Sequence, residues 1–224
     1  MLKVKTFTLI GGFKISVKIK ICGITNLEDI KLLEAYPVHY LGFILYPPSP
    51  RYVGSRLSEL LKAVKIPKKV AVFVDAPYEE IKSALDLGVD LIQLHGRENL
   101  DLARKIGLQR CIKTFRIKDS LSFDELDYWR DAYALLLDTY KEGLPGGTGK
   151  TFNWDIARDI VLKGHRIFLA GGLNPDNVLE AVSKVNPYAI DLSSGLEKSP
   201  GKKDPKKIEV FFEKLKGVTT PLVS

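Results

Sequence analysis

The sequence has few cysteines and no long hydrophobic run, and both absences narrow the class of protein. Its 224 residues include 2 cysteines, Cys22 and Cys111, which do not form a CxxC motif. We therefore expect neither a disulfide framework nor a zinc site, and a reducing, cytoplasmic environment fits best. No stretch of about 18 uninterrupted apolar residues is present, so we expect no membrane span.

The segment at residues 1–16, MLKVKTFTLIGGFKIS, is basic and partly apolar. It lacks the long apolar core and the small-residue cleavage site of a signal peptide. A short strand, a disordered extension and a misassigned start all fit it, and we assign it no role. We expect one domain over residues 17–217, followed by a C-terminal tail at 218–224. The 45% apolar composition is enough to bury one core of that size.

The chain is basic, with a formal net charge of +7 and a pI of about 9.2. A positive net charge of this size can favour binding to nucleic acid, to an anionic membrane surface or to an anionic small substrate. Most lysines mingle with Glu and Asp along predicted helices, as on a solvated surface, so we expect no nucleic-acid or membrane partner. The exception is a cluster before the last helix, formed by Lys202, Lys203, Lys206 and Lys207. The abundance of Lys and Glu is also typical of proteins from hot environments and is compatible with a homodimer.

Eight short apolar runs alternate with amphipathic segments along the chain. Read as strands, the runs cover 18–22, 40–45, 69–74, 91–96, 110–115, 133–138, 166–170 and 189–194. Near-continuous apolar strands separated by helices predict a parallel sheet that is covered on its outer face. Eight such units in this length predict an α/β fold, a single (β/α)8 TIM barrel of eight parallel strands. An open, doubly wound sheet is the alternative, but no GxGxxG motif follows the first strand.

Polar residues at the strand ends are the candidates for a functional site, because a (β/α)8 barrel carries its active site at the carboxyl ends of its strands. The turns Gly171-Gly172 and Ser193-Ser194-Gly195 follow the last two strands. Backbone amides at such turns, next to a helix N-terminus, suit a phosphate. A glycine-rich segment at 146–149 could close over the ligand. The alternative is that these glycines only permit tight turns.

Cys22 and Asp138 form a candidate base and acid. Cys22 ends the strand in KIKICGIT, and Asp138 ends the run LLLD. A thiolate is a competent base, and Lys20 on the same strand face could favour it. An aspartate in apolar surroundings has a raised pKa and can hold a proton. Each also has a plain explanation, since a lone cysteine is often a core residue, as we expect of Cys111, and an aspartate after a strand is often a turn residue.

Three further strand-end residues could contact a substrate. Arg51 lies in the loop PPSPRYV, where a stiff backbone could present its guanidinium to a carboxylate, although a surface arginine fits equally well. His95 follows the fourth strand with Gln93 and could contact a ligand or be satisfied within its loop. Asp191 could accept a hydrogen bond from a substrate amine or cap its loop. At the first helix, we expect Thr25 and Glu28 to form a capping box.

From residue 18 to 217 the chain resembles the phosphoribosylanthranilate isomerase family of tryptophan biosynthesis. The motifs that carry the resemblance are KICGIT at 20–25, SPRYV at 49–53, VFVD at 72–75, QLHG at 93–96, LLLDT at 135–139, GGTGKTFNW at 146–154, LAGGLNPDNV at 169–178 and DLSSGLEKSPGKKD at 191–204. Several motifs in the right order make it specific. The departure is 1–16, because family members usually begin close to the first strand.

The resemblance implies an Amadori rearrangement of a phosphorylated aminosugar, N-(5-phosphoribosyl)anthranilate, to 1-(2-carboxyphenylamino)-1-deoxyribulose 5-phosphate. It implies that Cys22 removes the proton from ribose C2 and that Asp138 protonates the ring oxygen. It also implies that no metal or organic cofactor takes part, since the substrate itself forms the Schiff base.

The same resemblance assigns the substrate contacts. Arg51 matches the family's arginine at the anthranilate end, and Asp191 matches the acid near the substrate amine. The phosphate site falls on Gly171, Gly172, Ser193, Ser194 and Gly195. Two alternatives remain: the similar sugar isomerase of histidine biosynthesis, whose two-aspartate arrangement disagrees with Cys22, and a non-catalytic protein that binds a phosphate ligand or nucleic acid.

Overall fold

The computed structural model describes residues 17–117, 122–139 and 153–216, and eight parallel strands form a closed barrel. The strands are β1 (Lys18–Cys22), β2 (Tyr40–Ile44), β3 (Lys68–Phe73), β4 (Leu91–Leu94), β5 (Cys111–Ile117), β6 (Ala134–Thr139), β7 (Ile167–Leu169) and β8 (Ala189–Leu192). Each pairs in parallel with the next in sequence, and β8 pairs with β1 to close the ring. The predicted (β/α)8 barrel is confirmed, and the open-sheet alternative is wrong.

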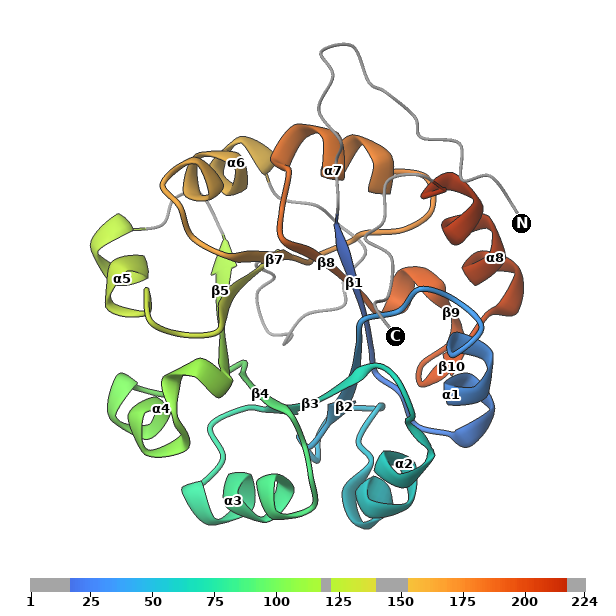
Figure 1. The fold of residues 1–224 in the computed structure, drawn as a ribbon, viewed down its shortest axis with the longest axis horizontal. Coiled ribbons are helices and arrows are strands. Elements are labelled where there is room, and N and C mark those ends of the chain that lie inside the picture. The colour runs from blue at the N-terminus through green and yellow to red at the C-terminus, as the bar shows by residue number, and fades with distance from the viewer. Residues whose placement is uncertain (1–16, 118–121, 140–152, 217–224) are drawn as a thin grey trace.

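Helices surround the strands on the outside of the barrel (Figure 1). They are α1 (Leu27–Leu33), α2 (Leu57–Ala63), α3 (Tyr78–Asp86), α4 (Leu100–Ile106), α5 (Phe123–Tyr128), α6 (Trp154–Leu162), α7 (Val178–Val185) and α8 (Pro205–Lys214). Between β8 and α8 come a 3-10 turn, η3 (Ser194–Leu196), and a small antiparallel hairpin of β9 (Glu197–Ser199) and β10 (Lys202–Lys203). No helix in the described part of the chain is both long enough and apolar enough to cross a membrane.

The alternation of side chains in β1 explains how one strand serves both the core and the site. Ile19 and Ile21 are fully buried in the apolar layer between strands and helices. Burial of a side chain of this size stabilises the fold by about 1.5–3 kcal/mol. The intervening residues, Lys18, Lys20 and Cys22, point into the barrel, since successive side chains of a strand face opposite ways. Cys22 therefore reaches the barrel interior at the carboxyl end of the strand.

Three tyrosines pack together inside the barrel at the amino ends of the strands, away from Cys22. The hydroxyl of Tyr40 lies 2.8 Å from that of Tyr133 and 3.3 Å from that of Tyr188, and the latter two are 3.4 Å apart. Lys18 Nζ donates to the Tyr188 hydroxyl at 2.8 Å. The hydroxyls thereby satisfy one another, with Tyr40 buried and Tyr133 and Tyr188 partly exposed.

The capping box predicted for α1 is wrong. Asn26 caps this helix, and its side-chain oxygen accepts a hydrogen bond from the Asp29 amide at 2.8 Å. Thr25 turns away because its hydroxyl donates to the Gly201 carbonyl oxygen at 2.6 Å, a contact 176 residues away in sequence. Because Thr25 makes this tertiary contact, Asn26 is the N-cap in its place, and the helix begins one residue later than predicted.

Some predictions fall outside the described residues. These are the N-terminal segment 1–16, the tail 218–224 and the glycine-rich segment at 146–149. The domain boundaries proposed for the two ends of the chain therefore stay predictions.

Candidate active site

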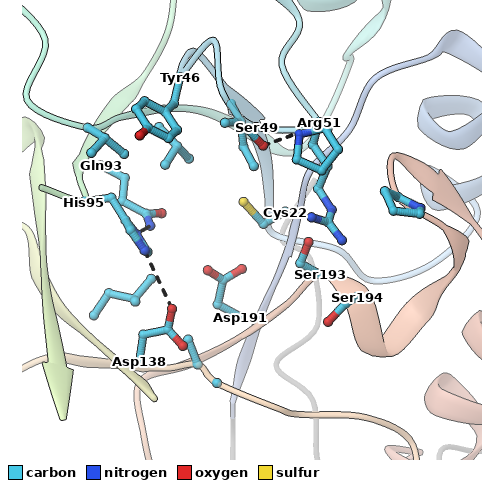
Figure 2. Close-up of a pocket in the computed structure, with 18 of the residues that line it drawn as sticks. Cys22, Tyr46, Ser49, Arg51, Gln93, His95, Asp138, Asp191, Ser193 and Ser194 are labelled. Carbon is cyan, nitrogen blue, oxygen red and sulfur yellow. Dashed lines mark hydrogen bonds and ion pairs between the residues drawn. The ribbon is translucent and has the colours of Figure 1, made fainter. Parts of the chain in front are cut away.

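A cavity of about 410 Å³ lies at the carboxyl ends of the barrel strands. This volume is within the range of small-molecule sites, roughly 300–1,000 Å³. Cys22 reaches the cavity from β1, Asp138 from β6 and Asp191 from β8, while His95 follows β4 (Figure 2). Gly195 is the one predicted site residue that does not line it. Residues that are far apart in sequence are thus brought together at one end of the barrel.

Cys22 is buried among charged side chains of both signs. Burial raises the pKa of its thiol above the ordinary value and Asp191 raises it further, whereas Lys20 and Lys203 lower it. Gly42, its neighbour on β2, leaves room for the sulfur, since a Cβ at that position would lie 2.6 Å from Sγ. Lys20 therefore acts on the thiol in the direction that the sequence predicted, and Lys203 acts in the same direction.

Asp191 lies between Cys22 and Asp138 in the view of Figure 2. Its Oδ2 accepts a 2.8 Å hydrogen bond from Lys20 Nζ, and both side chains are buried. Its Oδ1 is also buried and has no hydrogen-bond partner among the described residues. An unsatisfied buried acceptor costs about 1–3 kcal/mol. The Asp191 carboxylate is therefore suited to accept an N–H group from a ligand in the cavity.

His95 stands beside Asp138, with its Nε2 3.7 Å from Asp138 Oδ2. Its other ring nitrogen, Nδ1, is 2.8 Å from the Gln93 amide nitrogen and 3.2 Å from Thr114 Oγ1. With the Gln93 amide in this orientation its nitrogen donates to Nδ1, so the ring proton lies on Nε2, the nitrogen that faces Asp138, while Gln93 Oε1 is left buried with no partner among the described residues. Burial lowers the pKa of His95 to about 3, and the cation Arg116 contributes to the lowering. His95 is therefore a neutral donor at neutral pH.

Arg51 makes a bidentate ion pair, but with a residue of the chain itself. Its Nε donates to Glu197 Oε1 at 2.9 Å, and its Nη2 donates to Oε2 at 2.6 Å. The side chain crosses over Gly23, where a Cβ would lie 2.5 Å from Arg51 Cδ. The Nε edge of the guanidinium is thus taken by Glu197, so a substrate carboxylate would have to meet the remaining N–H groups of Nη1 and Nη2.

Sequence reasoning missed Glu197 and misread Lys203. The predicted basic cluster is wrong at Lys203, which is buried and paired with Glu197 at 3.0 Å, whereas Lys202 next to it is exposed. Both residues lie within the segment DLSSGLEKSPGKKD, so the motif could have pointed to them. Composition alone could not separate them from surface charges, because only the path of the β9–β10 hairpin decides which side chains point inward.

The two predicted phosphate turns meet at the edge of the cavity. Gly171 and Gly172 both have positive φ values, 84° and 66°, and line the cavity with Ser193 and Ser194. Gly195 lies beneath them, where a Cβ would collide with the Leu173 carbonyl oxygen. Gly195 thus allows the two turns to pack closely. Within the described ranges, no group of three or more His, Cys, Asp or Glu side chains is arranged to hold a metal ion.

Comparison with known proteins agrees with this geometry. A family model described as N-(5'phosphoribosyl)anthranilate (PRA) isomerase matches residues 19–214. The N-(5'-phosphoribosyl)anthranilate isomerase of Aquifex aeolicus is 51% identical over 203 residues, which cover 89% of this chain and 98% of the relative. The enzyme of the same name from Trichlorobacter lovleyi is 42% identical over 205 residues, covering 89% and 98%.

Solved structures give the same result. Phosphoribosyl anthranilate isomerase from Thermotoga maritima superposes with a TM-score of 0.82 at 35% identity, covering 90% of this chain and 99% of that one. The structure from Thermus thermophilus gives 0.80 at 35% identity, covering 89% and 98%. The match runs from β1 to α8 and includes all the strand ends that form the cavity. The chain therefore belongs to the N-(5'-phosphoribosyl)anthranilate isomerase family.

Proposed function

We propose that this chain isomerises N-(5-phosphoribosyl)anthranilate to 1-(2-carboxyphenylamino)-1-deoxyribulose 5-phosphate, an Amadori rearrangement in tryptophan biosynthesis. The observation that carries the proposal is that Cys22 and Asp138 line one cavity, from β1 and β6, beside the glycine turns after β7 and β8. A related structure, with a TM-score of 0.79 at 33% identity, holds the reduced form of this product. A base, an acid and an anion site in one cavity are the parts that the rearrangement needs.

Asp138 acts first, as the general acid. It donates a proton to the furanose ring oxygen, the ring C1–O bond breaks, and the substrate nitrogen forms a protonated Schiff base with C1. The neutral imidazole of His95 keeps an N–H directed at the Asp138 carboxyl group. This arrangement holds the Asp138 side chain toward the reacting sugar.

Cys22 acts second, as the general base. Its thiolate removes the proton from C2 of the Schiff base, and the electron pair moves to give the enolamine. Protonation at C1 and loss of the hydroxyl proton at C2 then give the aminoketose, so the net reaction moves hydrogen without an external oxidant. Lys20 favours the thiolate by its charge and, through its ion pair, also holds Asp191.

The remaining residues bind the two anionic ends of the substrate. Arg51 receives the anthranilate carboxylate through the N–H groups of Nη1 and Nη2 that the Glu197 pair does not use. Asp191 accepts the N–H of the substrate amine through Oδ1. The phosphate lies at Gly171, Gly172, Ser193 and Ser194, with Gly195 supporting the turn. Backbone amides are expected to supply most of the phosphate contacts.

Steady-state kinetics on the fluorescent anthranilate substrate test this mechanism. We expect Cys22→Ala and Asp138→Asn each to lower kcat by about 10²–10⁴-fold, the usual contribution of one general acid or base. Binding should persist, because neither change removes a phosphate or carboxylate contact.

Cys111→Ala is the matched control, because Cys111 is buried in the outer core and does not line the cavity. It should keep turnover close to that of the unmodified protein. Near-native turnover in Cys22→Ala or Asp138→Asn would contradict the assignment of that residue as base or acid. Absence of isomerase activity in the purified protein would contradict the proposed reaction.

We further propose that the protein acts in the cytoplasm and forms a homodimer. Both cysteines are free, which suits a reducing compartment. One related structure, at 34% identity, is described as a monomer generated from the dimeric enzyme of Thermotoga maritima. Sedimentation equilibrium gives the mass of this protein in solution, and a monomer at all concentrations would contradict the dimer.

A further inference from the structure

Two charged residues that follow β8 are buried behind the site instead of lying on the surface. Lys203 is 1% exposed and Glu197 is 6% exposed, and their Nζ and Oε1 atoms are 3.0 Å apart. Both belong to the β9–β10 hairpin. A buried ion pair is a poor source of net stability, because both charges lose their hydration. Such a pair next to an active site therefore calls for a functional explanation.

Each member of the pair holds a different part of the site. Lys203 Nζ donates to the backbone carbonyl oxygen of Cys22 at 2.6 Å, at the end of β1. Glu197 accepts three hydrogen bonds from the Arg51 guanidinium, two from Nε and one from Nη2. Neither Lys203 nor Glu197 lines the cavity. The pair thus links the proposed base to the proposed carboxylate contact, from outside the substrate's reach.

Charged side chains of both signs surround the Cys22 thiol. Lys20 from β1 and Lys203 from β10 lower the pKa of the thiol, whereas burial and Asp191 from β8 raise it. Arg51, from the loop after β2, also interacts with Cys22 and is paired with Glu197 from β9. Asp138 and His95 line the same cavity. Lys203 is therefore one of the cations that favour the thiolate against the effect of burial.

We propose that Lys203 and Glu197 are positioning residues for this reaction. Lys203 fixes the Cys22 end of β1 and favours the thiolate. Glu197 fixes the orientation of the Arg51 guanidinium, so that the N–H groups it does not use meet the substrate carboxylate. The inference rests on the proposed function of Cys22 and Arg51. It adds a reason why a hairpin outside the barrel sheet takes part in the chemistry.

The pH dependence of Cys22 alkylation tests the effect on the thiol. The rate of reaction with iodoacetamide is followed on the Cys22 peptide by mass spectrometry, so that Cys111 does not interfere. Lys203→Met should move the alkylation midpoint up by about 1 pH unit, since it removes a buried cation. Glu197→Gln should move the midpoint down, since it removes the negative charge but keeps a side chain of similar size and shape. A purely structural role would move both variants in the same direction.

Kinetics separate the two members of the pair. Lys203→Met should lower kcat by about tenfold or more and change KM less, because the thiolate is the affected group. Glu197→Gln should raise KM by about tenfold and change kcat less, because Arg51 loses its charged anchor. Lys203→Arg keeps the charge and should return the alkylation midpoint toward that of the unmodified protein.

Lys202→Met is the control, because Lys202 is adjacent in sequence and exposed. Thermal unfolding checks that each variant is folded. If Lys203→Met fails to fold, Glu197→Gln still tests the inference, because an upward midpoint shift in that variant would contradict it. Equal midpoints in the Lys203→Met and Lys202→Met proteins, or shifts of Lys203→Met and Glu197→Gln in the same direction, would overturn the inference. Alkylation of Cys22 does not depend on turnover. A negative result in the alkylation experiment would therefore overturn only this inference, whereas near-native turnover in Cys22→Ala would overturn the proposed function.

Discussion

The sulfur of Cys22 occupies the space that a side chain at Gly42 would need. The two residues are partners across β1 and β2. A Cβ at residue 42 would lie 2.6 Å from Sγ and 3.1 Å from Cα of Cys22. The position of the thiol is therefore set by the absence of a side chain on the neighbouring strand.

We predict that Gly42→Ala displaces the thiol and lowers kcat by about 10–100-fold, because a misplacement of about 1 Å can cost about 100-fold. Steady-state kinetics measure the effect. The double variant Gly42→Ala/Cys22→Ala should be no slower than Cys22→Ala, because the loss acts through the thiol. A further loss in the double variant would mean that Gly42 acts elsewhere.

A second prediction concerns the phosphate turns. Gly195→Ala should push η3 away from the Leu173 carbonyl oxygen, because the added Cβ collides with it. We expect KM to rise by about tenfold or more with a smaller change in kcat, as for a lost binding contact. Inhibition by inorganic phosphate should weaken in parallel. A raised KM with unchanged phosphate inhibition would contradict a phosphate site at this turn.

A third prediction concerns stability in acid. The pKa of His95 is lowered to about 3 by burial and by the nearby cations, whereas a histidine in an unfolded chain titrates near about 6.5. As the pH falls below about 6.5, the unfolded chain binds a proton that the folded protein does not. The free energy of unfolding should therefore fall between about pH 6.5 and about 3.

Urea unfolding at about pH 7 and pH 5 measures this loss. Between the two, the unmodified protein should lose about 2 kcal/mol more than His95→Gln, at about 1.36 kcal/mol per pH unit. His165 also has a pKa lowered by burial, but it contributes equally to both proteins. An equal pH dependence in the two proteins would show that His95 accepts a proton while folded.

A fourth prediction concerns the tyrosines at the other end of the barrel. Burial alone would raise the pKa of Tyr188, but the hydrogen bonds from Lys18 and the other two tyrosines lower it to about 8. A step in phenolate absorbance should appear near pH 8 and should be missing in Tyr188→Phe. Because the folded pKa is below the unfolded value of about 10, this group adds stability as the pH rises from about 8 to 10.

Two variants check the assignment. Tyr128→Phe removes an exposed tyrosine and should leave the step unchanged. Lys18→Met removes the ammonium and should move the step to higher pH. A step that persists in Tyr188→Phe would assign the titration to another phenol.

The pattern of apolar residues predicted helices and strands correctly where short-range interactions determine them. The run at 18–22 matches β1, and the segment from Trp154 to Leu162 matches α6. Alternating and helical periodicities report which side chains meet the core, so they predict element type well. The start of α1 was missed because Thr25 bonds to Gly201, a partner that sequence spacing does not reveal.

The order of apolar runs in the sequence was enough to predict the barrel, and the strand-end polar residues were enough to predict which side chains share a site. Parallel strands joined by helices have few ways to pack, so position along the strand implies position in the cavity. Only the tertiary structure decided which charges serve the site. Lys202 and Lys203 are adjacent and identical in type, yet one is exposed and the other pairs with Glu197 behind Cys22. The charges near the Cys22 thiol therefore depend on the course of the β9–β10 hairpin. Long-range packing determines that course, and the local sequence pattern does not.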